Sequence, residues 1–458
     1  MAMFKPDSVR PAPYEKFAHQ SPAWFTDAKL GIFVHWGAYS VAAWAEPLGD
    51  MGTDEVPDSF ARNPYAEWYM NTSRIEGSPA WKHHREVFGG ADYYDLLDLW
   101  RAENFDADEV LALVKHTGAR YFVPTTKHHD GITLWDAPET GDLNTVARGP
   151  KRDLVAEFAD ATRRAGLKFG VYYSGGLDWH FAPAPPLVDK PDDLDEMFSS
   201  RPVDDSYARY AFTHVDDLIT KFAPDVLWDD IDWPDAGKPP GDHSLVRLFE
   251  RYYAAVPEGM INDRWGDTHW DYRTTEYAMG ATTGSDEPWE NCRGVGYSFG
   301  YNQLEDETTT LSGDELIRHF VDVVSRGGNL LLNIGLMADG TVPPIQRRSL
   351  EALGDWNAAH GDAIFSSVIV DSAVARPSNE PWVRWTATDA GVRAIVDADG
   401  EVRLDADAAL LDPATAVLSD GAAVTVNLDG DSLVVTLPPR AAGAGPHVVT
   451  FATAAVSR

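Results

Sequence analysis

The chain has 458 residues, of which 38 are basic and 72 acidic, so its formal net charge is −34. Nucleic acid and anionic membranes favour basic surfaces, and this charge therefore argues against both as partners. The single cysteine, Cys292, excludes an intrachain disulfide and a zinc site built from several cysteines. The N-terminus lacks a signal-peptide run, and no stretch approaches the ~20 apolar residues of a membrane span, so we expect a cytoplasmic protein.

Apolar segments typical of strands alternate with amphipathic helical patterns from about residue 30 to residue 360. The predicted strands lie at 30–36, 120–125, 168–174, 225–231, about 260–263 and 329–334. The predicted helices lie at 106–117, 153–165, 207–222, 244–256, 314–325 and about 345–359. This alternation implies parallel strands joined by crossover helices. The length and the repeat count favour a (β/α)8-like barrel over an open doubly wound sheet.

The pattern changes after about residue 362, where the helical periodicity stops. Two alternating segments at 424–428 and 432–437 flank Asp429-Gly430, which is a strong hairpin signal. We therefore predict two domains, a (β/α)8-like barrel at 1–362 and a small C-terminal β-sandwich at 363–458. The sandwich has few aromatic residues, so we expect it to pack against the barrel as a structural element.

Chemically active side chains gather where the predicted strands end, which is where the active site of a (β/α)8 barrel lies. The strand ends carry His35, His128, His129, Tyr172, Trp228, Asp229, Asp230 and Arg264, and the loops carry Glu67, Glu276 and Glu290. An unpaired carboxylate among tryptophans is costly, and perturbed acids of this kind cluster at functional sites. The strand that ends in Asp229 and Asp230 is therefore the strongest single indication of a site.

Two reaction classes fit these residues. Metal-assisted hydrolysis would use His35, His128, His129 and Asp230. However, neighbouring residues on a strand point to opposite faces, so His128 and His129 do not easily chelate one ion. Glycoside hydrolysis needs two carboxylates and no metal. The chain offers this second set more completely, so we expect no cofactor and no metal.

The strand-end segments resemble the α-L-fucosidases of glycoside hydrolase family 29. The matching segments are 29–37, 67–69, 127–131, 171–174, 227–230, 262–266 and 325–333, in the order in which the family has them. The resemblance implies a barrel followed by a β-sandwich. It also implies a retaining exo-glycosidase that removes terminal α-L-fucosyl residues from oligosaccharides or glycoconjugates through a covalent fucosyl-enzyme intermediate.

The resemblance also assigns roles to residues. It places the nucleophile at Asp230 and the acid/base at Glu276, the Glu of Thr274-Thr275-Glu276-Tyr277. Glu290, the Glu of a later Trp-Glu pair, is the runner-up acid/base. Substrate binding falls on His35, Glu67, Trp68, His128, His129, Tyr172, Trp228 and Arg264. A fucosylated glycan is then the partner, and a homo-oligomer is plausible for the family.

The chain departs from the family pattern at two acids. Asp229 stands where bacterial members often have Asn, and Asp232 adds an acid where a small residue is common. Negative charge near Asp230 would raise its pKa. Strand geometry predicts that Asp229 points away from Asp230 and that Asp232 lies past the strand end. A metal-dependent hydrolase and a binding protein on an inactive glycosidase scaffold remain as alternatives.

Overall fold

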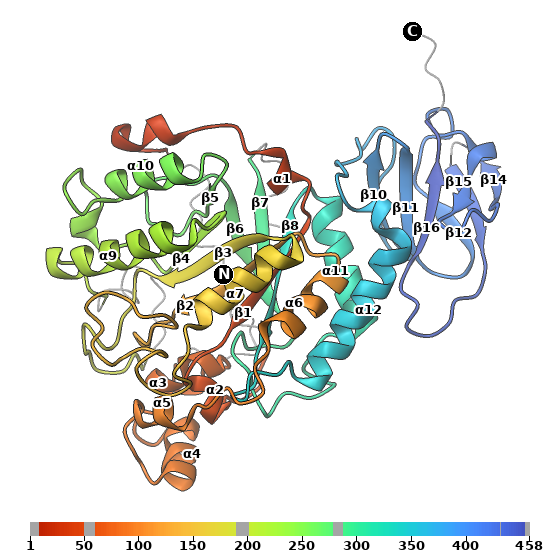
Figure 1. The fold of residues 1–458 in the computed structure, drawn as a ribbon. Helices are drawn as coiled ribbons and strands as arrows, with labels where there is room; N and C mark the ends of the chain where they lie inside the picture. The colour runs from red at the N-terminus through yellow and green to blue at the C-terminus, as the bar shows by residue number, and fades with distance from the viewer. Residues whose placement is uncertain (1–8, 50–59, 189–200, 278–286, 431, 454–458) are drawn as a thin grey trace.

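A computed structural model describes residues 9–49, 60–188, 201–277, 287–430 and 432–453. Eight parallel strands form one curled sheet in the order β5-β4-β3-β2-β1-β8-β7-β6. They are β1 (Leu30–His35), β2 (Tyr121–Lys127), β3 (Lys168–Ser174), β4 (Val226–Asp230), β5 (Met260–Ile261), β6 (Arg273–Glu276), β7 (Trp289–Gly294) and β8 (Asn329–Gly335). Helices cover the outside of this sheet (Figure 1). The predicted (β/α)8-like barrel is confirmed.

Six long helices follow the strands, as predicted. They are α6 (Ala107–His116), α7 (Leu154–Ala165), α9 (Asp205–Phe222), α10 (Leu245–Ala255), α11 (Gly313–Ser325) and α12 (Pro344–His360). Asp and Ser side chains cap the starts of five of them by accepting backbone N–H bonds that the first turn leaves open. At α11, Ser312 and Glu315 form a reciprocal capping box. Among the described residues, none of the helices is both long and apolar enough to cross a membrane.

The segments at β6 and β7 were expected to be loops, and that prediction is wrong. Both are strands of the parallel sheet, paired from Arg273↔Trp289 to Glu276↔Cys292. Their polar sequences, Arg-Thr-Thr-Glu and Trp-Glu-Asn-Cys-Arg-Gly, lack the apolar run that marks a covered parallel strand. They are nevertheless largely buried, because their polar side chains form hydrogen bonds with other side chains inside the barrel.

The sheet has one open seam. β5 and β6 are its two edges and form no ladder with each other in the part of the chain that the structure describes. Single hydrogen bonds bridge the seam instead, among them the backbone bond from the Asp271 N–H to the Ile261 carbonyl at 2.8 Å. The Ile261 N–H donates to Asp271 Oδ2 at 2.7 Å, and the hydroxyl of Thr274 donates to Asp263 Oδ1 at 2.7 Å.

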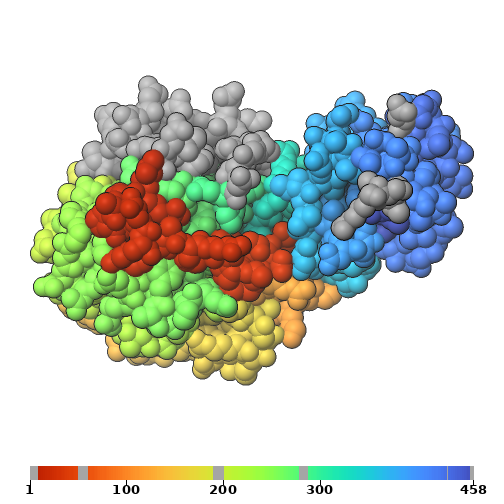
Figure 2. Space-filling view, turned by 90° about the horizontal axis from the view of Figure 1, so that it is seen from above, coloured from red at the N-terminus to blue at the C-terminus, as the bar shows by residue number. Residues whose placement is uncertain are grey.

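Short helices after β1 build one wall at the C-terminal end of the barrel. They are α2 (Tyr39–Ala42), η2 (Phe60–Arg62), η3 (Ala66–Trp68), α3 (Tyr69–Thr72), α4 (Pro79–Phe88) and α5 (Asp95–Leu99). Figure 1 shows α2 to α5 gathered below the sheet. Before β1, η1 (Ala12–Phe17) and α1 (Ala23–Thr26) cross the outer surface, and Figure 2 shows this red segment lying over the green part of the barrel. The remaining short helices are η4 (Asp235–Gly237), η5 (Gly361–Ala363) and η6 (Pro413–Thr415).

The C-terminal region forms two antiparallel sheets with a separate apolar core. The larger sheet contains β9 (Ser378–Asn379), β10 (Trp382–Thr388), β11 (Gly391–Asp397), β13 (Val417–Leu418) and β16 (His447–Phe451). The smaller contains β12 (Gly400–Leu404), β14 (Thr425–Asp429) and β15 (Ser432–Leu437), and the predicted hairpin pairs Asp429 with Ser432. The predicted β-sandwich is confirmed, while the boundary at 362/363 stays a prediction.

The sandwich packs on α11 and α12 (Figure 1). Ile395 and Val448 belong to the apolar core of the barrel. Arg384 of β10 forms a buried ion pair with Asp322 of α11, and the Trp356 indole N–H donates to the Pro446 carbonyl at 3.1 Å. These contacts join the two regions through apolar packing and a buried charge pair.

Candidate active site

Asp230, the predicted nucleophile, is the last residue of β4 and is 9 % exposed. One carboxylate oxygen accepts from the Tyr172 hydroxyl at 2.8 Å. The other accepts from Arg264 Nη1 at 2.8 Å and from the Ile231 N–H at 2.9 Å. Burial alone would raise the pKa of Asp230, but the Arg264 cation and these hydrogen bonds outweigh it and hold the pKa below the ordinary value. Asp230 is therefore a buried carboxylate kept in its charged form.

Glu276, the predicted acid/base, ends β6 on the far side of the seam. Its Oε1 accepts from the Tyr65 hydroxyl at 2.7 Å, and its Oε2 accepts from Arg264 Nη2 at 3.0 Å. The two terminal nitrogens of one guanidinium thus hold Asp230 and Glu276. A planar, fixed fork of this kind sets the position of both acids relative to each other.

The histidines predicted to bind substrate are neutral and oriented. His35 Nδ1 donates to Asn333 Oδ1 at 2.7 Å, because the Asn amide nitrogen is occupied at the Phe299 carbonyl. His129 Nδ1 donates to Ser174 Oγ at 2.7 Å, because that hydroxyl donates its own proton to Leu177. Burial lowers the pKa of His35 to about 4 and of His129 to about 3. Each ring therefore keeps Nε2 as an acceptor.

The third histidine, His128, lies beside both of these, so the expectation that His128 and His129 point to opposite faces is wrong: β2 ends at Lys127, and the alternation of a strand does not extend to them. The His128 ring is 5.6 Å from His35 and 4.0 Å from His129, measured between ring centroids. Burial lowers its pKa well below the ordinary value. Its Nδ1 is buried without a protein partner among the described residues. His129 Nε2 lies 3.9 Å from Asp230 Oδ2, so the cluster borders the carboxylate.

Glu67 and Trp68 come from the wall that follows β1. Glu67 Oε2 accepts from the Gly300 N–H at 2.7 Å and from the Ser298 hydroxyl at 3.1 Å, and burial raises its pKa to about 7. The Trp68 ring lies edge-on to His129 with centroids 5.3 Å apart and stacks on Phe60. Both predicted binding residues thus lie in the same neighbourhood as the histidines.

Trp228 and Glu290 occupy the barrel interior beneath the two acids. The Trp228 indole N–H donates to Glu290 Oε1 at 3.0 Å, and the Tyr121 hydroxyl donates to Glu290 Oε2 at 2.5 Å. The guanidinium of Arg264 lies 4.5 Å above the Trp228 ring, which also stacks on Tyr172. Glu290 is fully buried, and burial raises its pKa to about 7. Both oxygens of each glutamate accept a hydrogen bond, but Glu290 is held by Tyr121 and Trp228, whereas Glu276 shares the Arg264 guanidinium with Asp230.

The two extra acids of the Asp-rich strand lie away from Asp230, as strand geometry predicted. Asp229 is fully buried on the outer face of the sheet, where it approaches Gly175 and Trp233, and its oxygens have no hydrogen-bond partner among the described residues. Burial, and next the charge of Asp230, raise its pKa well above the ordinary value, which favours the neutral form of Asp229. Asp232 lies past the strand end and pairs with Lys238 at 2.9 Å and Arg201 at 3.2 Å.

Three residues of this site were not singled out from the sequence. Tyr65 holds Glu276, Asn333 orients His35, and Ser174 orients His129. All three stand in segments that match the family pattern or its neighbouring loops. Their signal was only that position, because their partners lie 211, 298 and 45 residues away along the chain.

Other features bear on the alternatives. Within the described ranges, no group of three or more His, Cys, Asp or Glu side chains is arranged to hold a metal ion.

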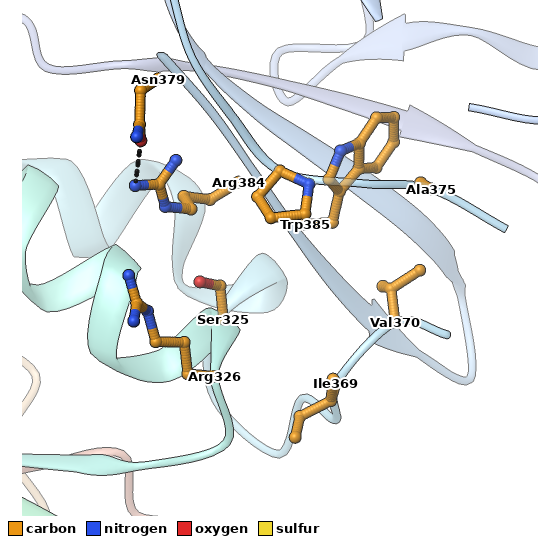
Figure 3. Close-up of a pocket in the computed structure, with 9 residues that line it drawn as sticks. Ser325, Arg326, Ile369, Val370, Ala375, Asn379, Arg384 and Trp385 are labelled. Atoms are coloured by element: carbon orange, nitrogen blue, oxygen red, sulfur yellow. Dashed lines mark hydrogen bonds between the residues drawn. The ribbon is translucent and has the colours of Figure 1, made fainter. Parts of the chain in front are cut away.

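A cavity of about 470 Å³ lies between α11 and the sandwich, and Figure 3 shows its lining around Arg326, Arg384 and Trp385. It sits where α11 ends and β8 begins, which is the opposite end of the strands from Asp230. This cavity is thus separate from the acid pair.

Comparisons with known proteins agree with this geometry. The family model described as Alpha-L-fucosidase matches residues 3–362. The alpha-L-fucosidase of Dictyostelium discoideum is 30% identical over 360 residues, covering 76% of this chain and 72% of that protein. Human tissue alpha-L-fucosidase is 31% identical over 355 residues, covering 76% and 69%. The Thermotoga maritima alpha-fucosidase structure is 40% identical with a TM-score of 0.83, covering 97% of this chain and 100% of that one. The chain belongs to the α-L-fucosidase family of glycoside hydrolases, glycoside hydrolase family 29.

Proposed function

We propose that the protein hydrolyses terminal α-L-fucosyl residues of fucosylated glycans with retention of configuration, using Asp230 as nucleophile and Glu276 as acid/base. The observation that carries this proposal is the shared guanidinium of Arg264, which joins Asp230 Oδ1 at 2.8 Å and Glu276 Oε2 at 3.0 Å. Retaining glycosidases need two carboxyl groups only about 5–5.5 Å apart. One planar fork that contacts both acids supports that close arrangement.

In the first step, a carboxylate oxygen of Asp230 attacks the anomeric carbon of the fucosyl group. The bond from that carbon to the leaving oxygen breaks, and Glu276 gives its proton to the leaving oxygen. In the second step, water attacks the fucosyl ester, Glu276 takes a proton from the water, and the Asp230 carboxylate is released. The lowered pKa of Asp230 favours the charged form that this attack requires.

The neighbouring residues suit a sugar with several hydroxyls and one apolar edge. His35 and His129 offer Nε2 acceptors whose direction is set by Asn333 and Ser174. His128, Glu67 and Trp68 complete the polar side, while Tyr172 and Trp228 supply ring faces next to Asp230. Arg264 balances the charge of Asp230 before the attack, and its attraction for that group weakens once the ester forms.

The nucleophile is tested with Asp230→Gly and an aryl α-L-fucoside. We expect kcat/KM to fall by about 10⁴-fold or more, since the covalent route is lost. Azide fills the space left by the side chain and should restore turnover, with a fucosyl azide of inverted configuration as product. Activity near that of the wild type would contradict the assignment. The configuration of the product that the wild type forms first tests retention separately.

The acid/base is tested by comparing Glu276→Ala with Glu290→Ala. Azide needs no base to attack a covalent intermediate, so it should speed up Glu276→Ala and yield a fucosyl azide of retained configuration. Glu290→Ala should lose activity through the displaced Trp228 ring, and azide should not restore it. Rescue of Glu290→Ala but not of Glu276→Ala would reverse the two roles.

A further inference from the structure

The residue after each of the two acids has an unusual backbone conformation. Ile231, which follows Asp230, has a φ of +74°, and Tyr277, which follows Glu276, has a φ of +49°. Among the described residues other than glycine with positive φ, Ile231 is the only β-branched residue and Tyr277 the only aromatic one. Such side chains are strained in this region and stay there only where their surroundings enforce it, which is common at active sites. These two turns therefore point to a constraint on the acids themselves.

The peptide group between Asp230 and Ile231 is held at both of its polar ends. Its carbonyl oxygen accepts from the Gly176 N–H at 3.2 Å, and its N–H donates to Asp230 Oδ1 at 2.9 Å. A peptide group is planar, so the bond to Gly176 restricts the direction in which the N–H points. The other donors to this carboxylate are the side chains of Tyr172 and Arg264. The Ile231 N–H is thus the donor whose position depends on the backbone alone.

Gly176, in the loop after β3, makes room for the turn. The residue is buried, and a Cβ at this position would lie 2.7 Å from the Asp232 nitrogen and 2.8 Å from both Cβ and Cγ2 of Ile231. Real Cβ atoms essentially never come closer than 3.0 Å to another heavy atom, so a side chain at 176 would push the turn aside. The side chain of Ile231 also packs against the apolar core of the barrel. Gly176 and that core together hold Ile231 in its left-handed conformation.

We infer that Ile231, seated against Gly176, is a positioning residue for the carboxylate of Asp230. The inference rests on the proposed function for the reaction and adds the device that orients its nucleophile. Oδ1 accepts from the Ile231 N–H and from Arg264, whereas in the described part of the chain Oδ2 accepts one hydrogen bond, from Tyr172. The turn therefore anchors Oδ1 and leaves Oδ2 as the oxygen that attacks. A displaced turn should slow the attack and make Asp230 a weaker acid.

The first experiment displaces the turn with Gly176→Ala and measures cleavage of an aryl α-L-fucoside. We expect kcat/KM to fall by about tenfold or more, the effect of losing one hydrogen bond to a charged group. Gly313→Ala is the matched control, because its Cβ would lie 2.5 Å from Ala352 Cβ, between α11 and α12. Both variants should lower the melting temperature, but Gly313→Ala should keep kcat/KM within about twofold. A Gly176→Ala enzyme with the kcat/KM of the wild type would overturn the inference.

The pH profile separates a positioning effect from general damage. Gly176→Ala leaves the charged and titratable groups around Asp230 unchanged, namely Tyr172, His129, His35, Arg264, Glu276 and Asp229. Loss of a backbone donor raises the pKa of a carboxylate, so the acid limb of kcat/KM should move up by about 0.5–1 pH unit. An acid limb that stays at the pH of the wild type would overturn the inference.

A rescue variant tests the contact between the two loops. Ile231→Gly removes Cβ and Cγ2, two of the three atoms that the new Cβ would meet, and glycine adopts positive φ without strain. Added to Gly176→Ala, it should recover about threefold or more of the lost kcat/KM and part of the shift in the acid limb. Ile231→Gly alone completes the double-mutant cycle. Effects that simply add, with no recovery, would overturn the inference.

Measurements without a substrate separate this inference from the proposed function. Ile231→Gly should melt above Ile231→Ala, because glycine alone is unstrained at positive φ. At Val256, which is half-buried with a φ of −133°, the alanine variant should melt above the glycine variant. Amide exchange at Ile231 should be about tenfold faster in Gly176→Ala than in the wild type.

These measurements also cover two failures. If the wild type cleaves no fucoside, the proposed function fails, and the melting order together with the amide exchange decides the inference. If Gly176→Ala does not fold, the melting order of the two Ile231 variants decides it. Ile231→Gly that melts below Ile231→Ala would overturn the inference in either case.

Discussion

Two of the buried arginines that pair with acids in the described part of the chain invite comparison, Arg264 at the mouth of the barrel and Arg384 where the barrel meets the sandwich. At the interface, Arg384 gives its donors to Asp322, to two backbone carbonyls and to Asn379. At the mouth, Arg264 bonds two acids from different strands and lies beside histidines that keep a free acceptor nitrogen. Burial of an ion pair is thus common to structure and function. What distinguishes the candidate site is that the histidines beside its ion pair keep acceptor nitrogens available for a ligand.

Among the variants that test this comparison, Arg264→Met should have the largest effect. Removing one partner of a buried ion pair costs about 3–5 kcal/mol. If the transition state loses that much stabilisation, kcat/KM for an aryl fucoside falls by about 10²–10⁴-fold. The pKa of Asp230 should also rise, because the cation that lowers it is gone. The acid limb of the pH profile of kcat/KM therefore moves to higher pH. An acid limb that does not move would contradict the role assigned to Arg264.

The interface pair should behave in the opposite way. Asp322→Asn leaves Arg384 and Arg326 without their shared carboxylate. We expect the free energy of unfolding, measured from urea denaturation, to fall by about 3 kcal/mol. Enzyme that remains folded should keep kcat/KM within about twofold. A large kinetic loss at unchanged stability would show that the interface affects the barrel mouth. It would contradict the assignment of Arg384 to structure and of Arg264 to the site.

Asp229 extends the comparison because, unlike Asp230 and Asp322, it is a buried acid that pairs with no arginine among the described residues. Its raised pKa means that the folded protein holds a proton that the unfolded chain releases above about pH 3.8, so this group lowers stability as pH rises. Asp229→Asn removes that cost. Relative to the wild type, the variant should therefore gain up to about 1.4 kcal/mol of unfolding free energy per pH unit within the window between the two pKa values.

Urea denaturation of both proteins at pH 4.5 and pH 7.5 measures this gain. The kcat/KM of Asp229→Asn should stay within about threefold of the wild type, because the side chain lies on the outer face of the sheet. A stability difference that is constant with pH would contradict the neutral form of Asp229.

The smallest effect should come from Asp232→Ala. This carboxylate pairs with Lys238 and Arg201 but is partly open to solvent, so the pairs are worth about 0–1 kcal/mol. We expect a change in unfolding free energy below about 1 kcal/mol that shrinks further in about 1 M salt. Activity should stay within about twofold. A larger kinetic effect would mean that charge beyond the strand end reaches Asp230.

The sequence could predict the features that depend on pattern and position. Alternating strands and helices predicted the barrel, and period-two geometry predicted the opposite faces of Asp229 and Asp230. Family motifs placed His35, Glu67 and Arg264 in one neighbourhood, although their roles stay predictions. Patterns of this kind repeat locally along the chain, which is why they are visible without a structure.

The missed features depend on contacts between distant segments. The strand β7 lacks the apolar run by which a buried strand is predicted. Its Glu290 can be buried because it accepts a hydrogen bond from Tyr121, which lies 169 residues away along the chain. Trp228 was expected to border the sugar, but no local pattern shows that its indole N–H is occupied by Glu290. The link from Tyr65 to Glu276 is likewise absent from any short stretch of sequence. Hydrogen-bond partners inside a barrel are set by strand order rather than by spacing.

The open seam would link the proposed reaction to the contact between two strands, β5 and β6. Arg264 follows β5 and Glu276 ends β6, so their 3.0 Å bond crosses the one joint that lacks a backbone ladder among the described strands of the barrel sheet. In the proposed mechanism Glu276 gains and loses a proton, so the attraction across that joint would weaken and return in each cycle. If the proposed mechanism holds, each turnover would weaken and restore this Arg264–Glu276 bond, which acts as a clasp between the two edges of the sheet. Amide hydrogen exchange at β5 and β6, compared with β1 and β8, would reveal whether that clasp loosens during turnover.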